Sequence, residues 1–295
     1  MQKKILLVLF VILIGNLLVA AVKIFLGFTL KVNSLTADGF HAITDSTSNI
    51  IGIIGIKIAY KPADKEHPDG YHKFETIASM IIGFMLFYIT GQIIYNAVNW
   101  FIKPTTPNFS VPGLITLIIT LFINIFIAIY EYRKGKKLNS EVLVSDSIHT
   151  RTDVLISLGV IITIIAIKLG LPPIIDPILS LVIAIFVFRS CLEIIKPTIS
   201  ILVDKKVIDE QTIMEIVYEI NKDIVDIHKI RSRGRNNYFY IDMHIIVAAN
   251  KTVKEIHSLS HLIEDVLSHK LGCGVELNAH IEPDEKCVNC RNVII

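Results

Sequence analysis

The sequence predicts an α-helical membrane protein with six transmembrane helices, followed by a small soluble α+β domain in the order αββαβ. Three observations lead to this fold class. Of the 295 residues, 52% are hydrophobic and only 19% are charged, which is too apolar for an ordinary soluble domain. Six apolar stretches are each long enough to cross a bilayer. From Asp204 onward these stretches end, and shorter segments with helix and strand periods follow.

The first apolar stretch, residues 5–30, follows two lysines at positions 3 and 4, a pattern that a signal peptide also shows. It is longer than the apolar region of a signal peptide, so we interpret it as the first membrane helix. Polar breaks separate it from the others. The predicted spans are residues 5–30, 34–59, 77–101, 112–132, 142–168 and 173–197.

An even number of spans returns both termini to one side of the membrane, and the basic residues indicate which side. Loops rich in Lys and Arg stay in the cytoplasm. Lysines and arginines gather before the first span, between the second and third, and between the fourth and fifth, whereas the opposite connections carry only Lys31, Lys103 and Lys168. The sequence therefore predicts a multi-pass protein of the cytoplasmic membrane with both termini in the cytoplasm.

The C-terminal part shows the alternation expected of a small α+β domain. Residues 238–248 alternate, with Tyr240, Asp242 and His244 on one face and Ile241, Met243 and Ile245 on the other. The predicted elements are a helix at 208–222, strands at 226–232 and 238–248, a helix at 252–270 and a strand at 275–282. We expect a transmembrane domain over 1–203, a cytoplasmic domain over 204–285 and a tail over 286–295.

Two predicted membrane helices carry the same acidic and histidine pattern, D-x-x-H-x-x-x-D. One reads Asp38, His41, Asp45 and the other Asp146, His149, Asp153. Offsets of three and four residues align side chains on one helix face. Each carboxylate near the bilayer centre costs roughly 2.5–3.5 kcal/mol, so four together cost on the order of 10 kcal/mol unless a cation neutralises them.

The imidazoles and carboxylates of these two rows suit a divalent metal. His41, Asp45, His149 and Asp153 form a mixed nitrogen and oxygen set that fits tetrahedral Zn²⁺ better than the all-oxygen sets of Mg²⁺ or Ca²⁺. Asp38 and Asp146 lie one turn away, as supporting partners, as part of an entrance, or as helix caps. The simpler alternative, caps and packed histidines, does not explain why the pattern occurs twice.

These motifs resemble those of the cation diffusion facilitator family. The stretch Ser34-Leu35-Thr36-Ala37-Asp38-Gly39-Phe40-His41 with Asp45, and the stretch from Ser145 to Val154, carry the resemblance, which extends over the whole chain. It implies a homodimeric exporter of divalent transition metals that takes protons in exchange, with a metallochaperone-like (ferredoxin-like) cytoplasmic domain. It assigns His41, Asp45, His149 and Asp153 to the transport site, in the version typical of zinc. Cd²⁺, Co²⁺, Fe²⁺ and Mn²⁺ are the alternative substrates.

The resemblance also implies two sites outside the membrane. In the loop after the second span, Asp64 and His67 match a peripheral metal site whose third ligand is replaced here by Tyr71, although a solvated loop is the simpler interpretation. In the C-terminal domain the family has a binuclear zinc cluster. The residues that match its ligands are His228, His244, His257, His280 and Glu282. Scattered surface histidines are the alternative there, and His280 and Glu282 share one strand face.

Several polar or reactive residues remain outside these sites. Cys287 and Cys290 form a C-x-x-C pair at the chain end, which can hold zinc or cycle as a redox pair. A single such pair is a weak signal, and we interpret it as part of a tail that scavenges metal. Asn16 and Asn49 lie inside apolar stretches, where we expect hydrogen bonds between helices. Asn49 also extends the face of Asp38, His41 and Asp45 and is a candidate lining residue of the pathway.

The composition and motifs also bear on other classes of function. A nucleic-acid partner is not expected, because no basic stripe is interleaved with aromatic residues. A membrane metalloenzyme is not expected either, because the H-E-x-x-H motif is absent. A passive metal channel and a metal-sensing receptor stay open, since both would use the same ligands without proton exchange.

Overall fold

The computed structural model describes residues 1–29, 33–103, 111–221, 224–235 and 238–284. The chain divides into two compact units, Met1–Ile199 and Ser200–Ile295. The predicted tail over 286–295, with Cys287 and Cys290, lies outside the described residues.

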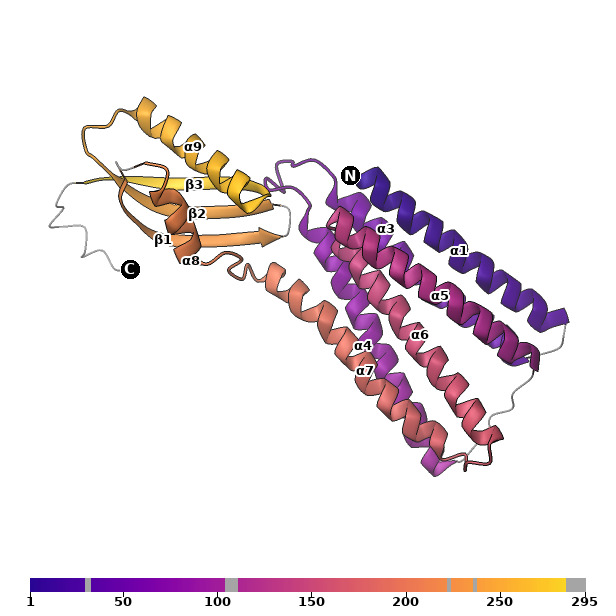
Figure 1. Cartoon of the computed structure of the whole chain (residues 1–295). Coiled ribbons are helices and arrows are strands. Elements are labelled where there is room, and N and C mark those ends of the chain that lie inside the picture. Colours follow the sequence, from indigo (N-terminus) through magenta and orange to yellow (C-terminus); the bar gives the residue numbers. More distant parts are fainter. Residues whose placement is uncertain (30–32, 104–110, 222–223, 236–237, 285–295) are drawn as a thin grey trace. The chain divides into compact units, whose positions relative to one another are not determined.

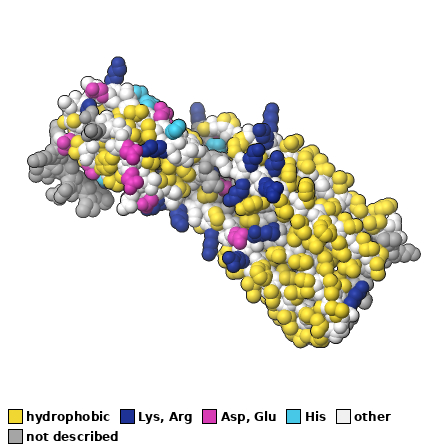
Figure 2. All heavy atoms as spheres, viewed as in Figure 1, with side chains coloured by type: hydrophobic (Ala, Val, Ile, Leu, Met, Phe, Trp, Pro, Cys, Tyr) yellow, Lys and Arg dark blue, Asp and Glu magenta, His cyan; other side chains and the backbone are white. Residues whose placement is uncertain are grey.

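The first unit is a bundle of long apolar helices (Figure 1). Five described helices are long and apolar enough to cross a membrane. Large apolar side chains such as Phe25, Phe122 and Phe126 are exposed on the bundle, and hydrophobic atoms cover most of the helical surface in Figure 2. Lipid is the solvent that suits such a surface. The five helices are α1 (Gln2–Thr29), α4 (Lys73–Ile102), α5 (Val111–Leu138), α6 (Glu141–Lys168) and α7 (Ile175–Leu202).

The second predicted span is present as two shorter helices, α2 (Asn33–Asp45) and α3 (Thr47–Ala59). Each has 13 residues, about 20 Å at 1.5 Å per residue, too short to span the bilayer alone. Ser46 lies at the break, where its hydroxyl donates to the Ala42 carbonyl oxygen at 3.0 Å. Ser46 keeps right-handed helical dihedral angles, φ −63° and ψ −11°, and its carbonyl oxygen still accepts from the Ile50 N–H at 3.3 Å. The interruption of the helix directly after Asp45 is therefore slight.

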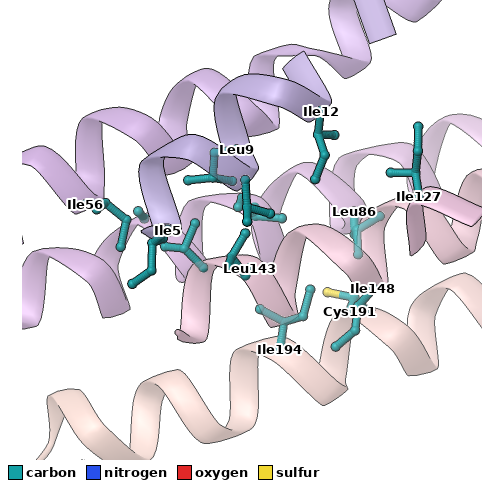
Figure 3. Packing of buried hydrophobic residues seen from close by; sticks show 14 of the residues in the cluster. Ile5, Leu9, Ile12, Ile56, Leu86, Ile127, Leu143, Ile148, Cys191 and Ile194 are labelled. Carbon is teal, nitrogen blue, oxygen red and sulfur yellow. The ribbon is translucent and has the colours of Figure 1, made fainter. Parts of the chain in front are cut away.

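Close helix packing in the bundle depends on small residues as well as on aliphatic ones. Figure 3 shows Ile5 and Leu9 of α1 beside Ile56 of α3 and Leu143 of α6, all fully buried. A Cβ atom added to Gly55 of α3 would overlap the side chain of Ala78 on α4. Helices α3 and α4 therefore approach each other closely through small residues, as is usual where membrane helices pack.

The connection between α5 and α6 is tight and fixes the start of α6. Asn139 has a left-handed φ of 47°, and the Ser140 hydroxyl then caps α6 by accepting from the Leu143 N–H at 3.4 Å. The same hydroxyl donates to Glu75 Oε1 of α4 at 2.7 Å. The N-terminal turn of α6 is thereby held against α4, and this sets the direction in which the acidic face of α6 points.

The second unit has the αββαβ order that the sequence predicts, which confirms this part of the fold class. Its elements are α8 (Glu210–Tyr218), β1 (Ile224–Arg235), β2 (Tyr238–Val247), α9 (Val253–Leu271) and β3 (Gly274–Pro283). The sheet order is β1-β2-β3, with β1 antiparallel and β3 parallel to β2. Helix α9 is the crossover that a parallel pair requires.

One face of the sheet is covered and the other is left for polar side chains. Ile241, Met243 and Ile245 of β2 are buried together with Ile263 and Leu267 of α9. Helix α9 starts at a capping box between Thr252 and Glu255 and ends at Gly272. The left-handed φ of 65° at this position is favourable for glycine because glycine has no Cβ atom. Residues that alternate with the buried ones, His244 among them, lie on the opposite face.

Candidate metal centres

The row on α6 lies in the interior of the helical bundle. Asp146 and His149 are 1% and 2% exposed, and Asp153 is partly buried. Neither ring nitrogen of His149 has a hydrogen-bond partner among the described residues. Since an unsatisfied buried polar atom costs about 1–3 kcal/mol, a buried imidazole with two such atoms calls for an explanation. A cation bound in this place would supply it.

The neighbouring arginine on α6 points away from this row. Arg151 is exposed and donates to Glu193 Oε2 of α7 at 2.7 Å, with Ser190 Oγ at 3.4 Å. Its positive charge is therefore neutralised on the outer side of α6. The row of Asp146, His149 and Asp153 keeps its acidic character, because Arg151 lies on a different face of the helix.

The other row lies on α2, and the structure describes only part of it. Asp45 is the last residue of α2, directly before the break at Ser46, and is partly buried. The side chains of Asp38 and His41 lie outside the described residues. Among the side chains that are described, Asp45, His149 and Asp153 do not form a group of three ligand atoms within 4.8 Å of one another.

A buried polar cluster next to the α6 row was only partly anticipated from the sequence. Asn16 of α1 donates to Asn49 Oδ1 of α3 at 3.1 Å, the interhelical bond expected of both residues. Asn49 in turn donates to Asp146 Oδ2. Glu131 of α5 was missed, although it is the one acidic residue of Val111–Leu138. It is fully buried, and Thr150 donates to its Oε2 at 3.2 Å.

The loop between α3 and α4 brings its three predicted residues together. Asp64 Oδ1 accepts from the N–H groups of Glu66 and His67 at 3.0 and 2.8 Å, and Tyr71 donates its hydroxyl to Asp64 Oδ2 at 2.7 Å. The Tyr71 hydrogen bond is the main reason why the pKa of Asp64 lies below its ordinary value. His67 Nδ1 is 3.6 Å from Asp64 Oδ1. Tyr71 thus occupies an oxygen that a metal would need.

The open face of the small sheet gathers a histidine from each strand. His228, His244 and His280 are register partners across β1, β2 and β3, with ring centroids 5.2 Å and 4.5 Å apart. Glu282 lies beside them. Its Oε1 is 2.6 Å from His244 Nδ1, and its Oε2 is 3.5 Å from His228 Nε2. The bond to His244 is the main reason why the pKa of Glu282 lies below its ordinary value.

This sheet cluster fits a zinc ion by its donor set. One ligand atom from each of His228, His244 and Glu282 lies within 4.8 Å of the other two. Two imidazole nitrogens and one carboxylate oxygen are ligands that zinc accepts, with a fourth position left for His280, 4.0 Å from Glu282, or for water. When bound, the metal would tie the three strands together through this face.

Two other residues near the sheet differ from the sequence expectation. His257 lies on α9, where its ring meets His261 edge-on at 4.5 Å, and it does not join the ligand group among the described residues. Asp226 was missed. Its Oδ2 is 3.3 Å from His228 Nδ1 and orients that ring. Its position two residues before His228 on a strand was the available signal.

Comparison with known families covers nearly the whole chain. A model described as the cation efflux transmembrane domain matches residues 9–203. A second model, described as the cation efflux protein, cytoplasmic domain, matches residues 206–284.

Individual relatives span most of this chain as well. An uncharacterised transporter of Methanocaldococcus jannaschii is 30% identical over 86% of this chain and 90% of its own length. The manganese efflux system protein MneP of Bacillus subtilis is 28% identical over 92% of this chain and 93% of its own length. A cadmium, cobalt and zinc/H(+)-K(+) antiporter of Bacillus subtilis is 30% identical over 91% and 86%.

Proposed function

Because the chain belongs to the cation efflux family, the cation diffusion facilitators, whose members are membrane transporters and not enzymes, we propose that it exports Zn²⁺ in exchange for protons. The observation that carries the choice of metal is His149. It is a buried imidazole with two unpartnered nitrogens, one helical turn from a carboxylate. Zinc accepts nitrogen and oxygen ligands together.

The proposed transport site consists of His41, Asp45, His149 and Asp153. Metal binding requires deprotonated ligands, so a metal ion that enters displaces protons. Free imidazole has a pKa of about 6.5, so a more acidic outside favours protonated histidines and release of the metal there. The site must alternate between the two sides. The helix break at Ser46, directly after Asp45, is where we expect α2 to change direction.

The remaining parts of the proposal concern assembly and orientation. Both termini lie in the cytoplasm, as the basic loops predict. The chain acts as a homodimer. Metal bound at His228, His244 and Glu282, with His257 and His280 as further ligands, joins the two cytoplasmic domains and makes export respond to the metal level. Asp64 and His67 form a weaker site because Tyr71 binds the same carboxylate.

Manganese export is the second candidate. Two observations favour it: MneP of Bacillus subtilis bears the name of a manganese efflux system, and Glu131 and Asp146 add buried oxygen ligands beside His149. Mn²⁺ prefers carboxylate and carbonyl oxygens over imidazole. Cd²⁺, Co²⁺ and Fe²⁺ fit the mixed ligand set as competing substrates of the zinc site.

The test is metal flux in proteoliposomes that contain a zinc-sensitive dye and a pH dye, measured with and without a pH gradient. We expect zinc transport with opposite proton movement, lost in D45A and D153A. Zinc flux without proton movement would indicate a passive channel. Binding without flux would indicate a metal sensor. Mn²⁺ transport that exceeds zinc transport would replace zinc by the second candidate.

A further inference from the structure

Glu131 and Asp146 place two carboxyl groups side by side in the buried interior of the bundle. They come from different helices, α5 and α6, and are 0% and 1% exposed. The carboxyl group of Glu131 interacts directly with that of Asp146 and, at longer range, with the charge of Asp153. Two ionised acids so close together in a medium that screens poorly repel each other, unless they share a proton or a cation lies between them.

The protein itself supplies too few hydrogen-bond donors for these carboxylates. Asn49 donates to Asp146 Oδ2, and Thr150 donates to Glu131 Oε2 at 3.2 Å. Glu131 Oε1 and Asp146 Oδ1 are buried and have no donor among the described residues. Neither acid is ion-paired with a lysine or arginine in the part of the chain that the structure describes. One oxygen on each acid is left for a ligand.

The available ligand atoms are all oxygens. They are the two carboxylates and the Thr150 hydroxyl, which also donates to the Asp146 carbonyl oxygen at 3.1 Å. The Asn49 amide is held in place by Asn16 and cannot rotate freely, because both of its ends are hydrogen-bonded. Hard divalent cations such as Mn²⁺ prefer oxygen sets, whereas zinc prefers sets that include imidazole or thiolate.

We propose that Glu131 and Asp146 form a second cation site in the membrane unit, lined by oxygens and suited to Mn²⁺ and similar hard divalent cations. Asp146 precedes His149 by three residues, about 4.5 Å along the helix axis, toward the α5–α6 connection. The site is thus an approach position to His149 and Asp153 from that end of the bundle. This role rests on the proposed transport site, whereas cation binding by the two acids does not.

The test measures Mn²⁺ binding to the full chain in detergent, with no transport step. The variant H41A/H149A/H228A/H244A removes both imidazoles of the proposed transport site and the two imidazoles of the sheet cluster that lie nearest to Glu282. In it we expect one bound Mn²⁺ whose pulsed EPR spectrum shows no ¹⁴N coupling. Adding E131Q or D146N should weaken this binding by at least about tenfold. Adding E75Q is the matched control, because Glu75 is equally buried but accepts a hydrogen bond from Ser140.

Each alternative has its own result. If no Mn²⁺ binds in the variant that lacks His41, His149, His228 and His244, the two acids share only a proton and the proposal is wrong. This result does not depend on whether the E131Q or D146N chain folds. Equal binding with and without E131Q and D146N, or a spectrum with ¹⁴N coupling, would also overturn it. Loss of zinc flux in D153A with Mn²⁺ binding intact would support both proposals separately. Retained zinc flux in D153A would overturn only the transport site.

Discussion

The row Asp146, His149 and Asp153 on α6 and the histidine cluster on the sheet use the same chemical groups, imidazole and carboxylate. The two differ in how far these groups are buried and in whether the imidazoles have partners. In the sheet, His244 and His228 already contact Glu282, and the His280 side chain is 67% exposed. In the membrane unit, His149 is 2% exposed and both of its ring nitrogens lack partners among the described residues. The sheet cluster is preassembled and partly exposed to solvent, whereas the row on α6 is mostly buried.

The difference follows from how each fold brings its ligands together. Strand register places His228, His244 and His280 side by side, and backbone hydrogen bonds hold that arrangement without metal. In the proposed transport site, the row on α6 would take its remaining ligands from α2, so the geometry would depend on helix packing. We expect a metal to stabilise the sheet unit and to be transported by the membrane unit, since a site that can open must not be rigid.

The largest expected effect is that of H149A on export. Removing a buried imidazole ligand should reduce zinc flux in proteoliposomes by at least about 100-fold, because the rest of the site binds metal too weakly. R151Q is the matched control on the same helix. It breaks a surface ion pair with Glu193, worth about 0–1 kcal/mol, and a long hydrogen bond to Ser190 Oγ, and it should leave flux near the wild-type value. Wild-type flux in H149A would remove His149 from the transport site.

The next effect concerns the sheet cluster. Zinc at about 100 times its Kd should stabilise the wild-type cytoplasmic domain by about 2.7 kcal/mol, seen as a rise in Tm in the full chain. H244A and E282Q should abolish that rise and leave export measurable. H261A is the control, because His261 contacts only His257 among the described rings. A Tm rise that persists in both variants would show that zinc binds elsewhere.

A change in helix packing is expected to affect the membrane unit and not the cytoplasmic unit. In G55A the new methyl group would overlap Ala78 and push α3 from α4, at a cost of about 1–3 kcal/mol in unfolding free energy. We expect a lower Tm of the membrane unit and slower export, with zinc binding at the sheet unchanged. G15A adds a methyl group where no atom lies within 4 Å, so it should have no such effect. Equal behaviour of both variants would contradict the tight contact.

The smallest effect is a pH shift in the α3–α4 loop. The pKa of Asp64 lies below its ordinary value of 3.8, so the ionised carboxylate stabilises the loop above that pH and the stabilisation is lost as the pH falls through the lowered value. Y71F removes the largest cause, and the pKa of Asp64 should rise toward 3.8. NMR titration of the labelled Asp64 carboxyl carbon measures it. An unchanged titration would mean that the backbone N–H groups alone lower the pKa.

Much of the fold could be predicted because it depends on local patterns. Hydropathy located every long helix, and alternation along β2 separated Ile241 and Met243 from His244. The interruption at Ser46 was not predicted, because a single serine in an apolar run disturbs a helix only in some surroundings. Asp226 was missed as a partner of His228, although residues two apart on a strand share one face.

The sequence by itself determined the spacing of Asp146, His149 and Asp153, because a helix places residues three and four apart on one face whatever surrounds it. Only the tertiary structure decided that Glu131, fifteen residues before Asp146 and on another helix, meets that aspartate in a buried place without enough donors. The rotation of α5 against α6 sets this contact. That rotation results from packing over many side chains, which no local motif encodes.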